Sequence, residues 1–271
     1  MTCRRTFIKA SASLALGAGL GGASAQGASR TGPKSLKVQL VGRRRPGMTL
    51  AEHRHHIRQV HGEAVLRYIR LDPENAPRRY VQNAVFDGQY RATPPGSDPF
   101  ALNRDFVTQV WVEDFAALER SRRTAFYNEH LKDDEDRFVD QASVVFLPSR
   151  EREIVSRAGT LVAAFKVFAF VQRAPSADAA AFASAWSRAA ESAGTLPLRH
   201  VQNDVIARPG TRLPVDAVDE FWLSDEAAAR ALLASWTKLL TDSLVRPGLA
   251  APEAGVVSLL AREDVVHAGP G

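Results

Sequence analysis

The sequence contains an internal repeat whose period is close to half of the chain. Arg-Tyr-Val-Gln-Asn at residues 79–83 returns as Arg-His-Val-Gln-Asn at 199–203. The stretch from Asp105 to Trp111 then returns from Asp216 to Trp222, with Asp, Val and Trp at the same spacing. A period of this length with only two copies does not fit a solenoid and indicates duplication of a whole small domain.

The first 25 residues are expected to be an export signal and not part of the fold. Arg4 and Arg5 precede an apolar, small-residue run at 10–22, and Ala-Ser-Ala at 23–25 is a cleavage pattern. The paired arginines are similar to those of a twin-arginine signal, although Cys3 stands where Ser or Thr is usual. The run is too short for a membrane anchor. We therefore expect the twin-arginine export machinery as a partner, no stable membrane anchor after cleavage at Ala25, and a periplasmic or secreted location.

The composition of the remaining chain excludes several classes of function. Removing the segment takes away three cations and no acid, so the formal charge falls from +5 to +2. The basic clusters at 43–45 and 122–123 are short and typical of solvated surface, so no nucleic-acid partner is expected. Cys3 is the only cysteine, which leaves the mature chain without disulfides, thiolate nucleophiles or Cys-ligated metals. Nucleotide-binding and serine-hydrolase motifs are missing as well.

Hydrophobic periodicity predicts the same element order in both halves of the chain. In the first half we expect strands at 36–41, 80–86, 106–112 and 142–147, and helices at 49–64 and 114–137. In the second half we expect strands at 160–171, 199–207, 217–223 and 255–261, and helices at 176–193 and 225–244. The order βαββαβ is that of a ferredoxin-like unit.

Two such units in tandem predict an α+β fold. A flexible lead-in at 26–34 would precede unit 1 at 35–150, and the charged stretch 149–158 would link it to unit 2 at 158–265. Each unit leaves one apolar sheet face bare, and the other copy can cover that face. The halves would then pack sheet to sheet as an internal pseudo-dimer with a central cleft, so we expect a monomer.

Several motifs of the first half resemble the EthD family of the dimeric α/β-barrel superfamily. They are Arg-Arg-Pro-Gly-Met-Thr at 44–49, Arg-Gln-Val-His-Gly at 58–62, Tyr-Val-Gln-Asn at 80–83 and the strand that ends in Trp111. The resemblance implies an intrachain dimeric α/β-barrel. Relatives in the superfamily include cofactor-independent monooxygenases, isomerases, cyclases and haem-degrading enzymes, so the resemblance implies a fold more than a reaction.

Four of the seven histidines lie within nine residues of the first predicted helix. At about 100° per residue, His53 lies on the apolar stripe, His56 and His61 flank it on opposite sides, and His55 points away. Imidazole exchanges protons near neutrality and His61 lies in the EthD motif, so we expect His61, with His56, to be catalytic. The alternative is that His61 caps the end of the helix. His53 and His56 could bind a metal, and His53 could be a haem ligand, but the sequence supplies no further ligand at a familiar spacing. No metal and no cofactor are therefore expected.

Polar residues on the strands provide the remaining candidates. Gln109 and Trp111 share a face of one strand, as Glu220 and Trp222 do in the repeat. An amide beside an indole suits a pocket wall, but a core Trp whose NH needs an acceptor gives the same pattern. The core interpretation is favoured for Trp222, and both remain open for Trp111. The expected substrate-binding residues are His53, Tyr80, Gln109 and Trp111.

The second copy lacks the His-Gly motif. When Trp186 is aligned with Ile57, Ala190 stands opposite His61. We therefore expect one competent site, in the first half, acting on a small hydrophobic molecule. The resemblance implies a cofactor-independent enzyme of the oxidoreductase or monooxygenase type, or of the isomerase or dehydratase type, for a hydrophobic or aromatic carbonyl compound. The alternative is a periplasmic protein that binds a small hydrophobic ligand or haem without catalysis.

Overall fold

The computed structural model describes residues 35–91, 98–157, 165–193, 197–207, 210–252 and 256–269. The expected export signal and lead-in lie outside these residues. The chain from Pro33 to Gly271 forms one compact unit. Within the described ranges, no helix is long and apolar enough to cross a membrane.

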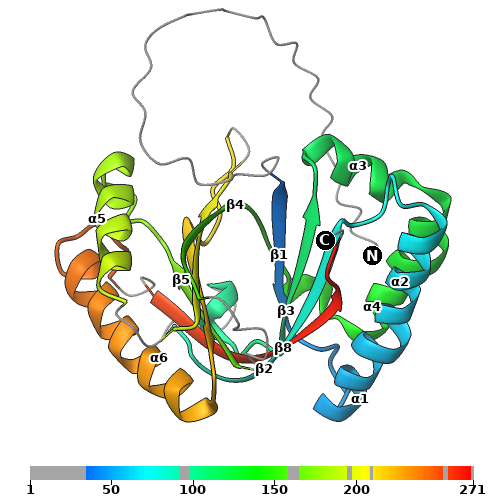
Figure 1. Cartoon of the computed structure of the whole chain (residues 1–271), viewed down its shortest axis with the longest axis horizontal. Coiled ribbons are helices and arrows are strands. Elements are labelled where there is room, and N and C mark those ends of the chain that lie inside the picture. The colour runs from blue at the N-terminus through cyan, green and yellow to red at the C-terminus, as the bar shows by residue number, and fades with distance from the viewer. Residues whose placement is uncertain are drawn as a thin grey trace, which may run out of the picture. The chain divides into compact units, whose positions relative to one another are not determined.

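Eight strands among the described residues close into an antiparallel barrel (Figure 1). They are β1 (Leu36–Gly42), β2 (Arg79–Gln89), β3 (Phe106–Val112), β4 (Val145–Ser156), β5 (Phe165–Val171), β6 (Arg199–Val205), β7 (Ala217–Leu223) and β8 (Val256–His267). The first half of the chain contributes the run β4-β1-β3-β2, and the second half contributes β8-β5-β7-β6. The β2–β8 and β4–β6 pairs join the two runs. The fold is therefore a mixed α/β fold built on a closed barrel.

The strands agree with the predicted ones most closely where the sequence repeats. β3 and β7 have the predicted bounds. β4 corrects the prediction, because it continues through most of the charged stretch 149–158 that was expected to be a link. That stretch pairs with β6, and its alternating pattern brings the Glu151 carboxylate to the buried Lys37 ammonium. The halves are thus joined along a strand ladder.

Helices cover the outer face of the barrel (Figure 1). Those of the second half are α5 (Ala179–Glu191) and α6 (Glu226–Leu240), followed by a π-helical segment at Thr241–Val245. They pack on β5, β7 and β8 in the largest apolar cluster among the described residues, which includes Trp186 and Trp236. Inside the barrel, a second apolar cluster contains Phe168 and Phe170.

The first predicted helix is interrupted by a π-helical segment. It consists of α1 (Leu50–His55), the π segment His56–His61 and α2 (Gly62–Leu71). α1 begins at a capping box, in which Thr49 and Glu52 exchange hydrogen bonds. In the π segment the Gly62 N–H binds the Ile57 carbonyl, five residues back. A Cβ on Gly62 would come within 3.2 Å of that oxygen, which favours glycine at this position.

The second predicted helix, 114–137, is also divided. α3 (Phe115–Arg123) ends where Thr124 adopts an extended backbone with ψ of 150°. A π segment at Tyr127–Lys132 and α4 (Asp133–Phe138) follow. Short 3₁₀ turns at Pro99–Ala101 and Gln141–Ser143 flank β3 and β4. The break brings the acidic start of α4 opposite the histidines of the first helix.

Candidate functional site

A cavity of about 130 Å³ lies between the sheet and the helices of the first half. Its walls come from outward-facing residues of β1 and β3 and from α2, α3, α4 and the two π segments beside them. Most of the lining is aliphatic or aromatic. Among the polar lining residues are His61, Tyr80, Thr108, Arg122, Tyr127 and Glu135. A small apolar cavity with a few polar groups is typical of a ligand site.

His61 lines this cavity and is oriented by a carboxylate. Its Nδ1 lies 3.1 Å from Asp134 Oδ2, and His56 Nε2 lies 2.9 Å from Asp134 Oδ1. A carboxylate on Nδ1 favours the tautomer with its proton on that nitrogen, so Nε2 becomes the nitrogen available to a ligand. His61 can therefore accept a proton from a molecule in the cavity.

The π segment corrects the predicted placement of His56 and His61 on opposite sides of the helix. The wider turn brings residues five apart onto one face, so both imidazoles reach Asp134. The same change leaves Val60 44% exposed. The helix continues beyond Gly62, so His61 does not cap a helix end. His56 contacts Asp134 but does not line the cavity.

Tyr80, predicted to bind substrate, lines the cavity from β2. Burial raises the pKa of its hydroxyl, which remains protonated. Gln82, two residues along the strand, donates to the Tyr80 oxygen at 3.0 Å and to the Ile57 carbonyl at 2.6 Å. Gln202 Nε2 likewise donates to the Trp186 carbonyl of α5 at 3.2 Å, so the repeated Val-Gln-Asn motif ties the first helix of each half to the sheet.

His53, predicted to bind substrate, is buried but does not line the cavity. Its ring packs on Phe106 and Phe138, with centroids at 5.4 and 5.8 Å. Neither ring nitrogen has a hydrogen-bond partner among the described residues. Burial lowers the pKa of His53 from 6.5 to about 4, against the attraction of Asp105. His53 is therefore neutral in the folded protein under ordinary conditions.

The buried neutral His53 predicts a loss of stability in mild acid. Below pH 6.5 the unfolded chain binds a proton at this residue that the folded protein does not bind until about pH 4. At about 1.4 kcal/mol per pH unit, the free energy of unfolding falls by about 3 kcal/mol across this window. Urea unfolding at pH 7 and pH 4.5 should show the loss in the native protein and not in His53→Phe. His55→Phe, at the exposed neighbour, should behave like the native protein, and an equal loss in all three would contradict the assignment.

The corresponding space in the second half is filled by aromatic side chains. Val110, in the cavity wall, and Phe221 occupy equivalent positions on β3 and β7. Val110 pairs with residues of β1 and β2, and Phe221 pairs with residues of β5 and β6. Phe221 stacks on His200 at 4.1 Å and meets Trp236 edge-on at 4.8 Å. Trp186 is 1% exposed in the same apolar cluster. These rings replace the cavity found in the first half.

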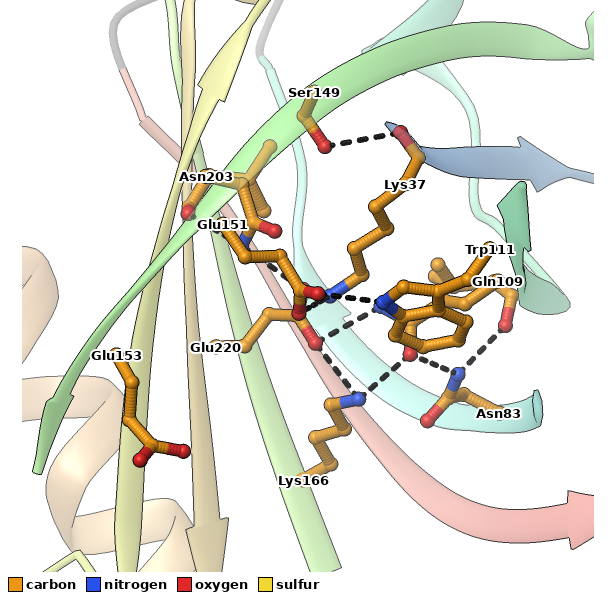
Figure 2. Close-up of polar contacts among 12 residues, drawn as sticks. Lys37, Asn83, Gln109, Trp111, Ser149, Glu151, Glu153, Lys166, Asn203 and Glu220 are labelled. Carbon is orange, nitrogen blue, oxygen red and sulfur yellow. Dashed lines mark hydrogen bonds and ion pairs between the residues drawn. The ribbon is translucent and has the colours of Figure 1, made fainter. Parts of the chain in front are cut away.

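A cluster of two lysines and three glutamates lies in the barrel interior. Figure 2 shows four of its members, Lys37, Lys166, Glu151 and Glu220. Glu220 is at its centre and binds both Lys37 and Lys166, the latter at 2.7 Å. Lys37 also binds Glu151 at 3.1 Å, and Lys166 binds Glu263 at 2.9 Å. Burial would raise the pKa of Glu220, but the ammonium groups of Lys166 and Lys37 outweigh burial and hold this pKa far below its ordinary value. Glu220 is therefore ionised although it is fully buried.

Gln109, predicted to bind substrate, belongs to this cluster and does not line the cavity. Its amide Nε2 donates to Glu220 Oε2 at 2.9 Å. Alternate residues of β3 face opposite sides of the sheet, so Thr108 and Val110 line the cavity while Gln109 and Trp111 face the barrel interior.

Both repeated tryptophans have an acceptor for the indole N–H. Trp111 Nε1 donates to Glu151 Oε2 at 2.5 Å, and Trp222 Nε1 donates to Glu263 Oε1 at 3.0 Å. Each indole is 7% exposed. The interpretation of a core tryptophan with a satisfied N–H therefore holds for Trp222 and also for Trp111, and the prediction of Trp111 as a substrate-binding residue is corrected.

Three residues of the site were not anticipated from sequence: Tyr127, Asp134 and Glu135. A partial indication existed, because the acidic run 133–136 has a charge opposite to that of the histidine-rich helix. The described residues contain no group of three or more His, Cys, Asp or Glu side chains arranged to hold a metal ion. His53 and His56, considered as a ligand pair, both pack on Phe138, but only His56 binds a carboxylate, that of Asp134.

Comparison with known proteins confirms the expected domain and fold. Residues 45–142 match the EthD domain. A search of curated proteins gave no match. The structure is similar to that of an anthrone oxidase-like protein, with a TM-score of 0.54 and 8% identity over 86% of this chain and 94% of that chain. The domain match covers the first half of the chain, and the likeness to the solved structure shows a shared fold.

Two further solved structures are similar at lower scores. A proposed monooxygenase from Lactobacillus acidophilus has a TM-score of 0.47 and 10% identity over 87% of this chain and 98% of its own. A variant of chlorite dismutase from Candidatus Nitrospira defluvii has a TM-score of 0.49 and 8% identity over 87% of this chain and 93% of its own.

Proposed function

We propose that this protein is an enzyme of the oxidoreductase type, with one active site in the cavity of the first half and His61 as its general base. The observation that carries the proposal is the His61–Asp134 pair in the cavity wall. A carboxylate that orients a histidine towards a cavity is a recurring arrangement in proton-transfer enzymes. Both residues lie within the EthD match, and the name of the anthrone oxidase-like structure suggests oxidation by O₂.

The proposed substrate is a small hydrophobic carbonyl compound with an acidic C–H bond. A cavity of about 130 Å³ is close in size to an apolar cavity of about 150 Å³ that holds benzene, so one aromatic ring fits. His61 Nε2 would take the proton of a CH₂ group beside the carbonyl, and the electron pair left on carbon would react with O₂. One oxygen atom becomes a new carbonyl, and the other leaves as water with the two hydrogens. The substrate carbon is oxidised and O₂ is reduced, so no further reductant is needed.

We further propose how the two halves of the chain arose and where the protein acts. The two halves descend from duplication of a ferredoxin-like unit, which is supported by the equal strand order and by the equivalent positions of Gln109 and Glu220 in the barrel. The chain acts as a monomer in the periplasm or outside the cell. Arg4, Arg5 and the Ala-Ser-Ala pattern at 23–25 support export.

Filling the cavity tests the proposed site. Val110→Phe copies the second half, where Phe221 occupies the corresponding position. We expect it to weaken binding of single-ring ketones such as phenylacetone at least about tenfold, or about 1.4 kcal/mol, because the new ring takes the place of the ligand. Val60→Phe, at a 44% exposed position, makes the same change outside the cavity and serves as the control.

Binding is followed by calorimetry, and chemistry by C–H exchange in D₂O and by oxygen consumption. Unchanged affinity in Val110→Phe would place the ligand elsewhere. Native protein that binds ketones but exchanges no C–H and consumes no oxygen would be a binding protein and not an enzyme.

A further inference from the structure

Asp134 and Glu135 are neighbours on α4 with different surroundings. Asp134 binds the two imidazoles of His56 and His61. Glu135 lines the cavity, where the Tyr127 hydroxyl donates to its Oε1 at 3.3 Å. Arg122 lines the same cavity. One carboxyl thus binds His61, and the next one faces the cavity.

These surroundings move the two pKa values in opposite directions. Burial would raise the pKa of Asp134, but hydrogen bonds from His61 and His56 lower it. Burial raises the pKa of Glu135, although the charges of His61 and Arg122 act against it. The titratable and charged groups that face Glu135 are His61, Tyr80, Arg122 and Tyr127 from other elements and Asp136 from its own helix. Two carboxyl groups with opposite shifts are typical of sites where one stays ionised and the other acts as an acid.

We propose that Glu135 is a second catalytic residue, the acid that gives its proton to the substrate carbonyl oxygen while His61 takes the proton from carbon. This inference rests on the proposed function. The C–H electron pair becomes a C=C bond, the carbonyl π pair takes the proton of Glu135, and the product is a neutral enol. Glu135 becomes a carboxylate and His61 an imidazolium. The substrate class is therefore an enolisable ketone or aldehyde.

Each charge formed in this step meets a group of opposite character that is already in place. The His61 imidazolium is paired with Asp134, 3.1 Å from Nδ1. The Glu135 carboxylate accepts from Tyr127 and lies in the field of Arg122. Charges that are preorganised in this way stabilise a transition state without rearrangement of solvent. The cavity therefore suits enolisation better than it would with His61 alone.

The pH profile of C–H exchange tests the role of Glu135. With phenylacetone in D₂O, exchange by the full chain should fall at high pH as Glu135 loses its proton. Glu135→Gln keeps an N–H donor that does not titrate, so the alkaline descent should disappear. Glu135→Ala should slow exchange by about 100-fold. Glu129→Gln, an exposed acid outside the cavity, serves as the control and should keep the descent.

Binding of 4-nitrophenol separates this inference from the proposed function, because its oxygen stands for the enol oxygen and its absorbance needs no turnover. Glu135→Ala should weaken this binding about tenfold. An alkaline descent that persists in Glu135→Gln, or nitrophenol binding indifferent to Glu135→Ala, overturns the role of Glu135. If no carbonyl compound is exchanged but nitrophenol binding still depends on Glu135, the proposed function fails and the assignment of Glu135 to the ligand oxygen survives.

Discussion

Replacing Glu220 with glutamine is expected to lower the free energy of unfolding by about 3 to 5 kcal/mol, the usual cost of removing one partner from a buried ion pair. The change leaves Lys37 and Lys166 beside a neutral amide, although each retains one other carboxylate. Their side chains are 0% and 1% exposed, so water cannot replace the lost partner. Guanidinium unfolding, followed by tryptophan fluorescence, measures the loss.

The exchanged double variant, Gln109→Glu with Glu220→Gln, is the matched control. Asn203 Nδ2 donates to Glu220 Oε1 at 2.9 Å, and Asn83 Nδ2 lies 3.3 Å from Gln109 Oε1. Lys166 also donates to Gln109 Oε1 at 2.8 Å, so a carboxylate at 109 meets donors already in place. Gln109→Glu alone puts two carboxylates in contact and should be destabilising, whereas the double variant should recover most of the stability. A double variant as unstable as the sum of the single changes would show that the two positions are not equivalent.

The parts of the fold that could be predicted from sequence are those where one local pattern decides the structure. β3 and β7 alternate cleanly and end at the repeated Trp111 and Trp222, so both strands were located correctly. The second part of β4 was missed because Arg150, Glu151 and Arg152 are typical of a solvated link. Only the approach of β6 gives this stretch a strand partner, and such a partner is not visible in the local sequence.

The helix irregularities could not be predicted for a different reason. Hydrophobic periodicity assumes 3.6 residues per turn, and one π turn shifts every later residue by about 100°. No proline or internal glycine marks the start of the segment at His56, and the anchor that accompanies it, Gln82 on the Ile57 carbonyl, is distant in sequence. His56 and His61 were therefore predicted to lie on opposite sides of the apolar stripe, whereas both imidazoles bind Asp134 in the structure.

For the candidate site, the sequence identified the residue types but not the faces. His61 and Tyr80 do line the cavity. Gln109 and Trp111 share a face of β3, as predicted, and this face is the one inside the barrel. Which face of a strand meets the helices depends on how the whole barrel closes, and the local sequence does not show this. Glu135 has no motif of its own, since an acid in a charged helix is usually solvated surface.

His61→Ala is expected to slow C–H exchange and any linked oxidation at least about 100-fold, because the proposed general base is lost. The cost in stability should be no more than about 1 to 3 kcal/mol, the usual contribution of a hydrogen bond to a charged group. Exchange of phenylacetone in D₂O measures the rate, and thermal unfolding of the same samples measures the stability.

His56→Ala provides a matched comparison, because it removes the other imidazole from the same carboxylate. The two bonds are similar in length, 2.9 Å for His56 and 3.1 Å for His61, so the two variants should lose similar stability. Only His61 lines the cavity, so His56→Ala should slow exchange less than tenfold, through a less restrained Asp134. Equal rate losses in the two variants would mean that the histidines act through the orientation of Asp134 and α4. The base would then have to be sought among the other polar groups of the cavity, with Glu135 first.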